Sequence, residues 1–330
     1  MFYNLPRLSK MRFAKSGWVL PIIVLSQFAC TSLWFAGNAI LPDLQEAFHI
    51  QGGAIGHITS AVQFGFISGT LIFAWLAISD RFSPSRIFFI CAVAGALSNI
   101  AILYLADGFL SLLLLRIITG FLLAGIYPVG MKIASDHHEK GLGKALGFLV
   151  GALVIGTAFP HLLKALTQSL PWKFVILFTS GCAAAGGLLM EILVPDGPYR
   201  KKSDRLDLLG FFRVFKARDL RAAAFGYFGH MWELYAFWAF VPLILSTYKN
   251  LNPEAGGFSI PLFSFLIIAA GGLACVFGGY FSQTFGSRRT AFVPLLSSGI
   301  CCLISPLLFQ LPVNIFFLIL MIVYSYNFMM

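Results

Sequence analysis

Long apolar runs are the feature that most constrains how this 330-residue chain can fold. A helix needs about 20 apolar residues to cross the hydrocarbon core of a bilayer, which is about 30 Å thick. Ten runs approach or exceed that length, at residues 17–41, 54–78, 86–106, 109–132, 144–166, 172–194, 222–246, 258–282, 290–309 and 313–330. Lipid offers no partner for free backbone groups, so each run is expected to be helical. The sequence predicts an all-α, polytopic membrane protein with about ten transmembrane helices.

The composition argues against soluble and nucleic-acid-binding classes. Only 11% of the residues are charged, whereas a soluble domain carries about 25%. The net charge of +10 comes from basic residues spread over short loops, so no nucleic acid is expected as a partner. The six cysteines form no C-x-x-C pair, which predicts neither a metal site nor a disulfide framework. We expect no cofactor and no enzymatic activity, and the absence of a G-x-x-x-x-G-K-[ST] loop excludes ATP-driven transport by this chain alone.

Lysine and arginine gather in alternate loops. They precede the first run and crowd residues 195–221, whereas the opposite loops hold mainly Lys164, Lys173 and Lys249 beside acidic residues. The positive-inside rule then places the N-terminus in the cytoplasm. We predict a multi-pass protein of a bacterial inner membrane.

The basic loop at 195–221 divides the chain into three parts. Residues 1–194 hold six runs and are predicted to form an N-terminal bundle, and residues 222–330 hold four runs of a C-terminal bundle. We interpret 195–221 as a cytoplasmic linker whose basic face touches anionic headgroups. Docking of a partner is the alternative.

Two stretches recur at an offset of 203 residues. Residues 80–83 correspond to residues 283–286, and the same offset places Gln27 on His230 and Trp34 on Phe237. Parallel repeats of this kind are a transporter architecture, with the substrate site near the midplane between the halves. Coincidence within apolar sequence is the alternative interpretation.

The loop after the second run resembles a motif of the major facilitator superfamily, G-x-x-x-D-R-x-G-R-R/K. It keeps Asp80 and Arg81, replaces both glycines, and offers Arg86 for the displaced basic residue. The second copy, at 279–289, keeps both glycines and ends in Arg288 and Arg289, with glutamine at the aspartate position. A further stretch, Arg116-Ile117-Ile118-Thr119-Gly120, resembles the R-x-x-Q-G motif of the fourth helix.

This resemblance covers the whole chain. It implies a two-bundle carrier that moves a small solute by alternating access, with Asp80, Arg81, Arg86, Arg288 and Arg289 in gating loops at the cytoplasmic mouth. A plain solvated turn is the alternative for such a loop. Superfamily members usually have twelve helices, so we expect the last two to be missing. An inactive truncated paralogue or a non-transporting membrane sensor is therefore the alternative to a secondary active transporter.

Glu233 and His230 lie one helical turn apart within the seventh run. An ionisable side chain at the bilayer centre costs roughly 3 kcal/mol on insertion scales, so it usually faces a bundle interior or a watery cavity. With Phe237 on the same stripe, the pair predicts a proton-coupling site or a contact to a polar solute. A structural polar clamp is the alternative.

Two further candidates come from the first and fourth runs. Gln27, Thr31, Trp34 and Asn38 share one helical face, which is polar and aromatic as the wall of a solute cavity would be. Interhelical hydrogen bonding is the alternative. For Arg116, the motif implies anion binding or a proton relay, which favours an anionic solute; outward snorkelling is the alternative.

Overall fold

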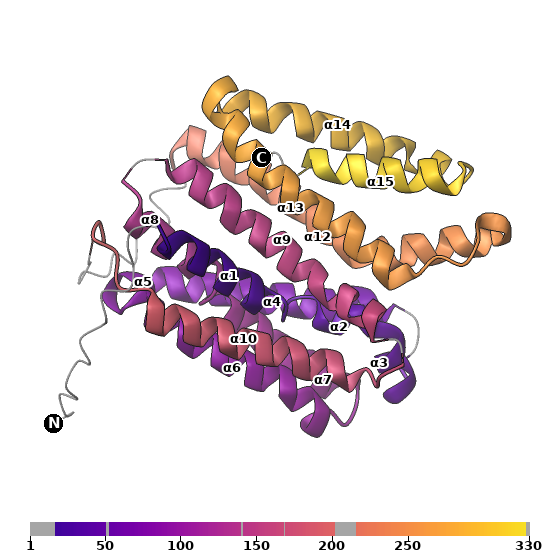
Figure 1. The fold of residues 1–330 in the computed structure, drawn as a ribbon, viewed down its shortest axis with the longest axis horizontal. Coiled ribbons are helices and arrows are strands. Elements are labelled where there is room, and N and C mark those ends of the chain that lie inside the picture. Colours follow the sequence, from indigo (N-terminus) through magenta and orange to yellow (C-terminus); the bar gives the residue numbers. More distant parts are fainter. Residues whose placement is uncertain (1–16, 51–52, 140, 168, 202–215, 328–330) are drawn as a thin grey trace.

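The computed structural model describes residues 17–50, 53–139, 141–167, 169–201 and 216–327. The first bundle comprises α1 (Val19–Thr31), α2 (Ala36–Ala39), α3 (Leu41–Ala47), α4 (Ala54–Trp75), α5 (Ile78–Arg81), α6 (Pro84–Leu105), α7 (Phe109–Leu123), α8 (Tyr127–His137), α9 (Leu142–Leu166) and α10 (Lys173–Leu193). The second bundle comprises α12 (Arg218–Leu251), the 3₁₀ turn η1 (Pro253–Ala255), α13 (Ile260–Phe285), α14 (Ser287–Leu308) and α15 (Val313–Asn327). The long helices run side by side, with the second bundle above the first in Figure 1.

The predicted all-α, multi-pass architecture is confirmed. Seven helical segments are long and apolar enough to cross a membrane, and three shorter apolar helices cover Val19–Thr31, Phe292–Leu308 and Val313–Ile322. Each of the ten predicted runs thus corresponds to a helix, or to a pair of helices, within the described residues. Of the predicted linker at 195–221, the structure describes residues 195–201 and 216–221.

The prediction of one continuous helix over residues 17–41 was wrong. α1 ends at Thr31, and α2 begins at Ala36. The Thr31 hydroxyl donates to the carbonyl oxygen of Gln27 at 2.9 Å, and the Ser32 hydroxyl donates to that of Ala29 at 2.6 Å. Hydroxyls that bond back to their own helix bend it. The first crossing is therefore interrupted in its middle by residues 32–35.

The fourth crossing is also interrupted, between α7 and α8. Pro128 lies at the start of α8, where its missing N–H removes a hydrogen bond that a continuous helix would make. Gly125 packs directly against Cys91 and Phe73, which leave no room for a side chain. The crossing predicted at 109–132 is accordingly two helices joined by a tight turn.

The two bundles meet along α9 and α13, which lie side by side in Figure 1. Glycines line this contact: a β-carbon on Gly151 would lie 2.8 Å from the carbonyl oxygen of Gly272, and one on Gly147 would lie 3.1 Å from that of Cys275. Small residues let helix backbones approach closely in membranes. We call Gly147, Gly151, Gly272 and Gly279 the glycine seam.

The packing of α12 differs between its two ends. Its first third, through Gly229, is almost entirely exposed, whereas His230, Trp238 and Leu245 are buried. The exposed part begins at the end of the molecule that holds α5 and the last turn of α8, which we call the linker end (Figure 1). The opposite end, near α3, is the far end. α12 therefore packs tightly only from the middle of the molecule to the far end.

Candidate functional site

Arg116 of α7 is completely buried beside the interruption in the first crossing. Its guanidinium donates hydrogen bonds to the carbonyl oxygens of Leu33 at 3.2 Å and of Trp34, and to Asn99 Oδ1 at 3.4 Å. Carbonyls at a helix end lack intrahelical partners. Within the described part of the chain, no carboxylate pairs with this guanidinium. Arg116 is held by backbone dipoles and fixes the interruption in place.

Asn99 of α6 extends this polar network to α10. Its amide nitrogen donates to Ser180 Oγ at 3.0 Å and to Thr179 Oγ1 at 3.3 Å. Ser98 lies 3.1 Å from the Thr119 hydroxyl of α7. Buried polar groups that are mutually satisfied fix one arrangement of the helices that carry them. The sequence analysis missed Asn99, although an asparagine inside an apolar run was a signal.

The interruption places two aromatic side chains of the first bundle against the second bundle. The Trp34 and Tyr235 rings stack with centroids 5.4 Å apart and an angle of 20° between their planes. Trp34 also contacts Phe66 of α4, at 4.6 Å. Phe35 meets Trp238 edge to face at 5.9 Å. We call these five residues the aromatic bridge.

The four residues of the predicted polar face of the first crossing make different contacts. Of its four members, Trp34 meets the other bundle, whereas Thr31 bonds back to its own helix. Asn38 donates to Thr59 Oγ1 of α4 at 2.8 Å. Gln27 is fully buried against Gly130 of α8, and neither amide atom has a hydrogen-bond partner among the described residues.

Glu233 is half-buried and faces α14 within its own bundle. Its carboxylate accepts hydrogen bonds from the Ser298 hydroxyl and, at 3.5 Å, from the Cys302 thiol. His230 is buried one turn earlier, next to the exposed part of α12, and Phe237 is half-buried one turn later. These contacts tie α12 to α14 and also stabilise a carboxylate inside the bundle.

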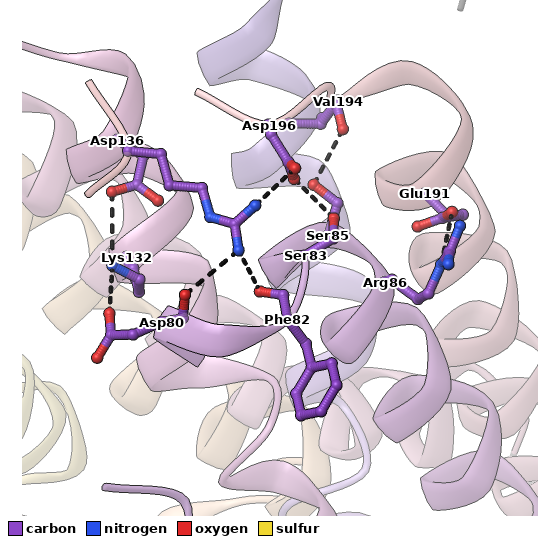
Figure 2. Close-up of polar contacts among 11 residues, drawn as sticks. Asp80, Phe82, Ser83, Ser85, Arg86, Lys132, Asp136, Glu191, Val194 and Asp196 are labelled. Carbon is purple, nitrogen blue, oxygen red and sulfur yellow. Dashed lines mark hydrogen bonds and ion pairs between the residues drawn. The ribbon is translucent and has the colours of Figure 1, made fainter. Parts of the chain in front are cut away.

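A charged cluster joins three segments at the linker end (Figure 2). Lys132 of α8 contacts Asp80 at 2.8 Å and Asp136 at 3.6 Å. Arg200 donates to Asp196 at 2.7 Å and to the carbonyl oxygen of Phe82 at 2.6 Å. The Ser83 hydroxyl donates to Asp196 at 2.6 Å, and the Ser85 hydroxyl donates to the carbonyl oxygen of Val194 at 2.9 Å. We call Asp80, Lys132, Asp136, Asp196 and Arg200 the charged latch.

The predicted gating residues have different environments. Asp80 belongs to the latch, Arg86 pairs with Glu191 at 3.7 Å, and Arg81 lies over the Phe82 ring at 5.9 Å. Arg289 is exposed, and the side chain of Arg288 lies outside the described part of the structure. The sequence analysis missed the latch roles of Lys132, Asp136, Asp196 and Arg200. Their opposite charges, close to chain segments that flank the motif loop, were the available signal.

These helices define a multi-pass membrane protein built from two bundles joined along α9 and α13. The family model of the Major Facilitator Superfamily matches residues 23–330. The chain therefore belongs to the major facilitator superfamily, a family of transporters, as its motifs predicted.

Solved transporters share this fold. The human organic anion transporter MFSD10 is 18% identical, with a TM-score of 0.69 over 96% of this chain and 85% of that chain. The nucleoside transporter NupG is 17% identical, with a TM-score of 0.68 over 95% of this chain and 80% of that one. The xylose transporter XylE from E. coli is 13% identical, with a TM-score of 0.69 over 96% of this chain and 85% of that chain. At these identities the likeness shows the fold alone.

A D-galactonate transporter of Escherichia coli O6:H1 is 28% identical over 152 residues. The match covers 44% of this chain and 34% of that transporter, about a third of its length.

Proposed function

We propose that this chain is a secondary carrier that moves a small solute by alternating access between its two bundles. The observation that carries the proposal is the uneven contact between the bundles. From the middle to the far end, one face of α12 is buried and its rings join the aromatic bridge, whereas the first third of the helix is exposed. Alternating access requires an interface that is closed at one end while the other can open.

The distribution of lysine and arginine supports an orientation for this carrier. With the N-terminus in the cytoplasm, the charged latch lies on the cytoplasmic side and the aromatic bridge closes the outer half. The bridge must then separate when the solute enters from outside. The glycine seam suits this motion, because it presents smooth backbone surfaces that can slide. A bacterial inner membrane is the proposed location.

We propose proton coupling through Glu233, with His230 beside it. The carboxylate is held by two neutral donors, Ser298 and Cys302. Protonation therefore removes a charge without breaking an ion pair, and the neutral side chain crosses between conformations at a lower desolvation cost. A purely structural clamp between α12 and α14 predicts no such dependence on protons.

Transport is tested with purified chain in liposomes that enclose a pH-sensitive dye. Mixtures of small solutes are added outside, and uptake is measured by mass spectrometry beside the dye signal. A carrier accumulates at least one solute relative to protein-free liposomes. Binding of solutes without any uptake would overturn the carrier and favour a non-transporting sensor.

Coupling is tested in the same liposomes with Glu233→Gln. We expect solute-driven proton movement to disappear while the folded yield is retained. Glu46→Gln is the matched control, because Glu46 is exposed on α3. Unchanged proton movement in Glu233→Gln would refute the coupling.

A further inference from the structure

One edge of the interface between the bundles is closed at the linker end. α9 begins at this end and α13 ends there, and their backbones lie close together: a β-carbon on Gly279 would be 3.2 Å from the carbonyl oxygen of Gly143. The glycine seam continues this contact to Gly151 and Gly272. At the same end, the first third of α12 is exposed (Figure 1). The bundles thus touch here between α9 and α13, while the start of α12 is uncovered.

A charged contact crosses between the bundles at the end of this edge. The Lys144 ammonium of α9 lies over the ring of Tyr280 of α13, with Nζ 5.1 Å from the ring centroid. A cation within about 6 Å of an aromatic ring centroid is attracted by the negative face of the ring. Lys144 follows Gly143 and Tyr280 follows Gly279. The close approach of the two glycines therefore brings the cation and the ring together.

This contact can persist while the helices move. Lysine carries its charge on a flexible four-carbon stem, and the attraction is to the ring face as a whole rather than to one atom. Lys144 and Tyr280 are both exposed, so no tightly packed neighbour fixes either side chain. The ammonium can follow the ring when α9 and α13 turn against each other.

We propose that Lys144 and Tyr280 form a tether that holds the α9–α13 edge together at the linker end while the two bundles rock. This inference rests on the proposed carrier function and names the edge about which the movement occurs. In that function the aromatic bridge must separate, whereas the tethered edge stays in contact. The alternative is that the two residues are independent anchors at the membrane surface.

A disulfide lock tests whether this edge stays closed. Lys144→Cys combined with Gly279→Cys is suited, because a β-carbon on Gly279 would lie 3.8 Å from the Cα of Lys144. Uptake from the solute mixture is measured in liposomes after oxidation and again after reduction, with the unaltered chain treated alike. We expect the oxidised form to transport at least as well as the reduced form, because the disulfide replaces the lost tether. A loss on oxidation that reduction reverses would overturn the tether.

A second lock is placed where the bundles have to part. Trp34→Cys combined with Tyr235→Cys, joined by a short bifunctional maleimide, should stop uptake, because these residues stack across the aromatic bridge. Uptake is compared before and after the cross-link. Continued uptake through this lock would contradict the proposed rocking movement and with it the tether.

Single variants separate a tether from two independent anchors. Lys144→Met and Tyr280→Leu each remove the contact, and each should lower the initial rate of uptake about two- to fivefold. Lys144→Arg and Tyr280→Phe are the matched controls, because they keep the cation and the ring face. The combined Lys144→Met and Tyr280→Leu variant should lose no more than either single variant. Additive losses, or a loss in Tyr280→Phe, would favour independent anchors and overturn the tether.

Thermal unfolding in detergent tests the contact without transport. The tether predicts that Lys144→Met and Tyr280→Leu lower the unfolding temperature non-additively. If the unaltered chain takes up no solute but these losses are non-additive, the carrier fails and the contact between the bundles stands. If the unaltered chain transports and the oxidised lock does not, the carrier stands and the tether fails.

Discussion

The two bundles tie their first helix to its neighbours with different chemistry. The repeat offset of 203 residues relates Cys30 to Glu233. The Cys30 thiol donates to the carbonyl oxygen of Ala183 on α10 at 3.3 Å, whereas Glu233 accepts hydrogen bonds from Ser298 and Cys302 on α14. The two related positions thus make contacts inside their own bundles. The first bundle uses a neutral group there, and the second uses one that can change its charge.

Ion pairs, in contrast to the ionisable Glu233, are found outside the second bundle among the described residues. Every ion pair found among the described residues lies in the first bundle or, for Arg200 and Asp196, in the linker segment that follows it. The first bundle also holds the buried Arg116, whose terminal nitrogens donate to the carbonyls of Leu33 and Trp34 and whose Nε–H has no partner among the described residues. We conclude that the first bundle is a fixed frame and that the second carries the group proposed to respond to protons.

The largest expected loss of stability comes from replacing Arg116 in the first bundle. Arg116→Met removes the donors to the carbonyls of Leu33 and Trp34 and should lower the free energy of unfolding by ~3 kcal/mol, since buried acceptors are left unpaired. Thermal unfolding in detergent measures it. Arg86→Met is the control, because the exposed Arg86–Glu191 pair is worth ~0–1 kcal/mol. Equal stability of Arg116→Met and the unaltered chain would mean that Arg116 does not fix the interruption.

A somewhat smaller effect is expected where the bundles meet. Gly151→Leu forces a side chain against the backbone of Gly272 and should destabilise the chain by ~1–3 kcal/mol through overpacking. Uptake should also fall, because the seam can no longer slide. Gly226→Leu is the matched control, since a β-carbon at Gly226 meets no atom within 4 Å. A loss in the control as large as in Gly151→Leu would contradict the role of the seam.

Two variants in the charged latch should lower the free energy of unfolding by different amounts. Lys132→Met leaves the nearly buried Asp136 without its nearest cation, and we expect a loss of ~1–2 kcal/mol. Asp80→Asn removes only a partly exposed pair and should cost ~0–1 kcal/mol. A double-variant cycle on thermal unfolding measures the coupling between Asp80 and Lys132. Full additivity would indicate that their 2.8 Å contact contributes nothing to stability.

The smallest effect on stability is expected at Glu233. Glutamine keeps an oxygen that can accept from Ser298, so Glu233→Gln should change the free energy of unfolding by less than ~1 kcal/mol. A larger loss, together with intact proton movement, would make Glu233 a structural clamp. The comparison between a fixed and a proton-responsive bundle would then fail.

Local sequence was enough to predict the crossings but not their interruptions. The length and apolarity of a run are properties of neighbouring residues, so all ten predicted runs coincide with helices, including the seven segments long enough to cross a membrane. The interruption at 32–35 contains neither proline nor glycine, and the hydroxyls of Thr31 and Ser32 do not by themselves distinguish it. Its stabilising partner, Arg116, lies 82 residues away from Trp34 and bonds to backbone carbonyls, which leave no trace in the sequence.

The candidate site was predicted in part for the same reason. Motif resemblance led to Asp80 and Arg116, and the cost of burying charge led to Glu233. Tyr235 was not singled out, because its importance depends on how the bundles meet across Trp34. Arg200 was assigned to a linker, although it bonds to Phe82 of the motif loop. Contacts between distant segments set these roles.

The interruption also gives Trp34 a rigid support. Residues 32–35 join α1 to α2, and Arg116 holds them against α7 through the carbonyls of Leu33 and Trp34. In the proposed carrier, Trp34 and Phe35 therefore stay with the first bundle when Tyr235 and Trp238 of α12 move away. Opening then breaks two defined ring contacts, Trp34 with Tyr235 and Phe35 with Trp238, and leaves the first bundle unchanged.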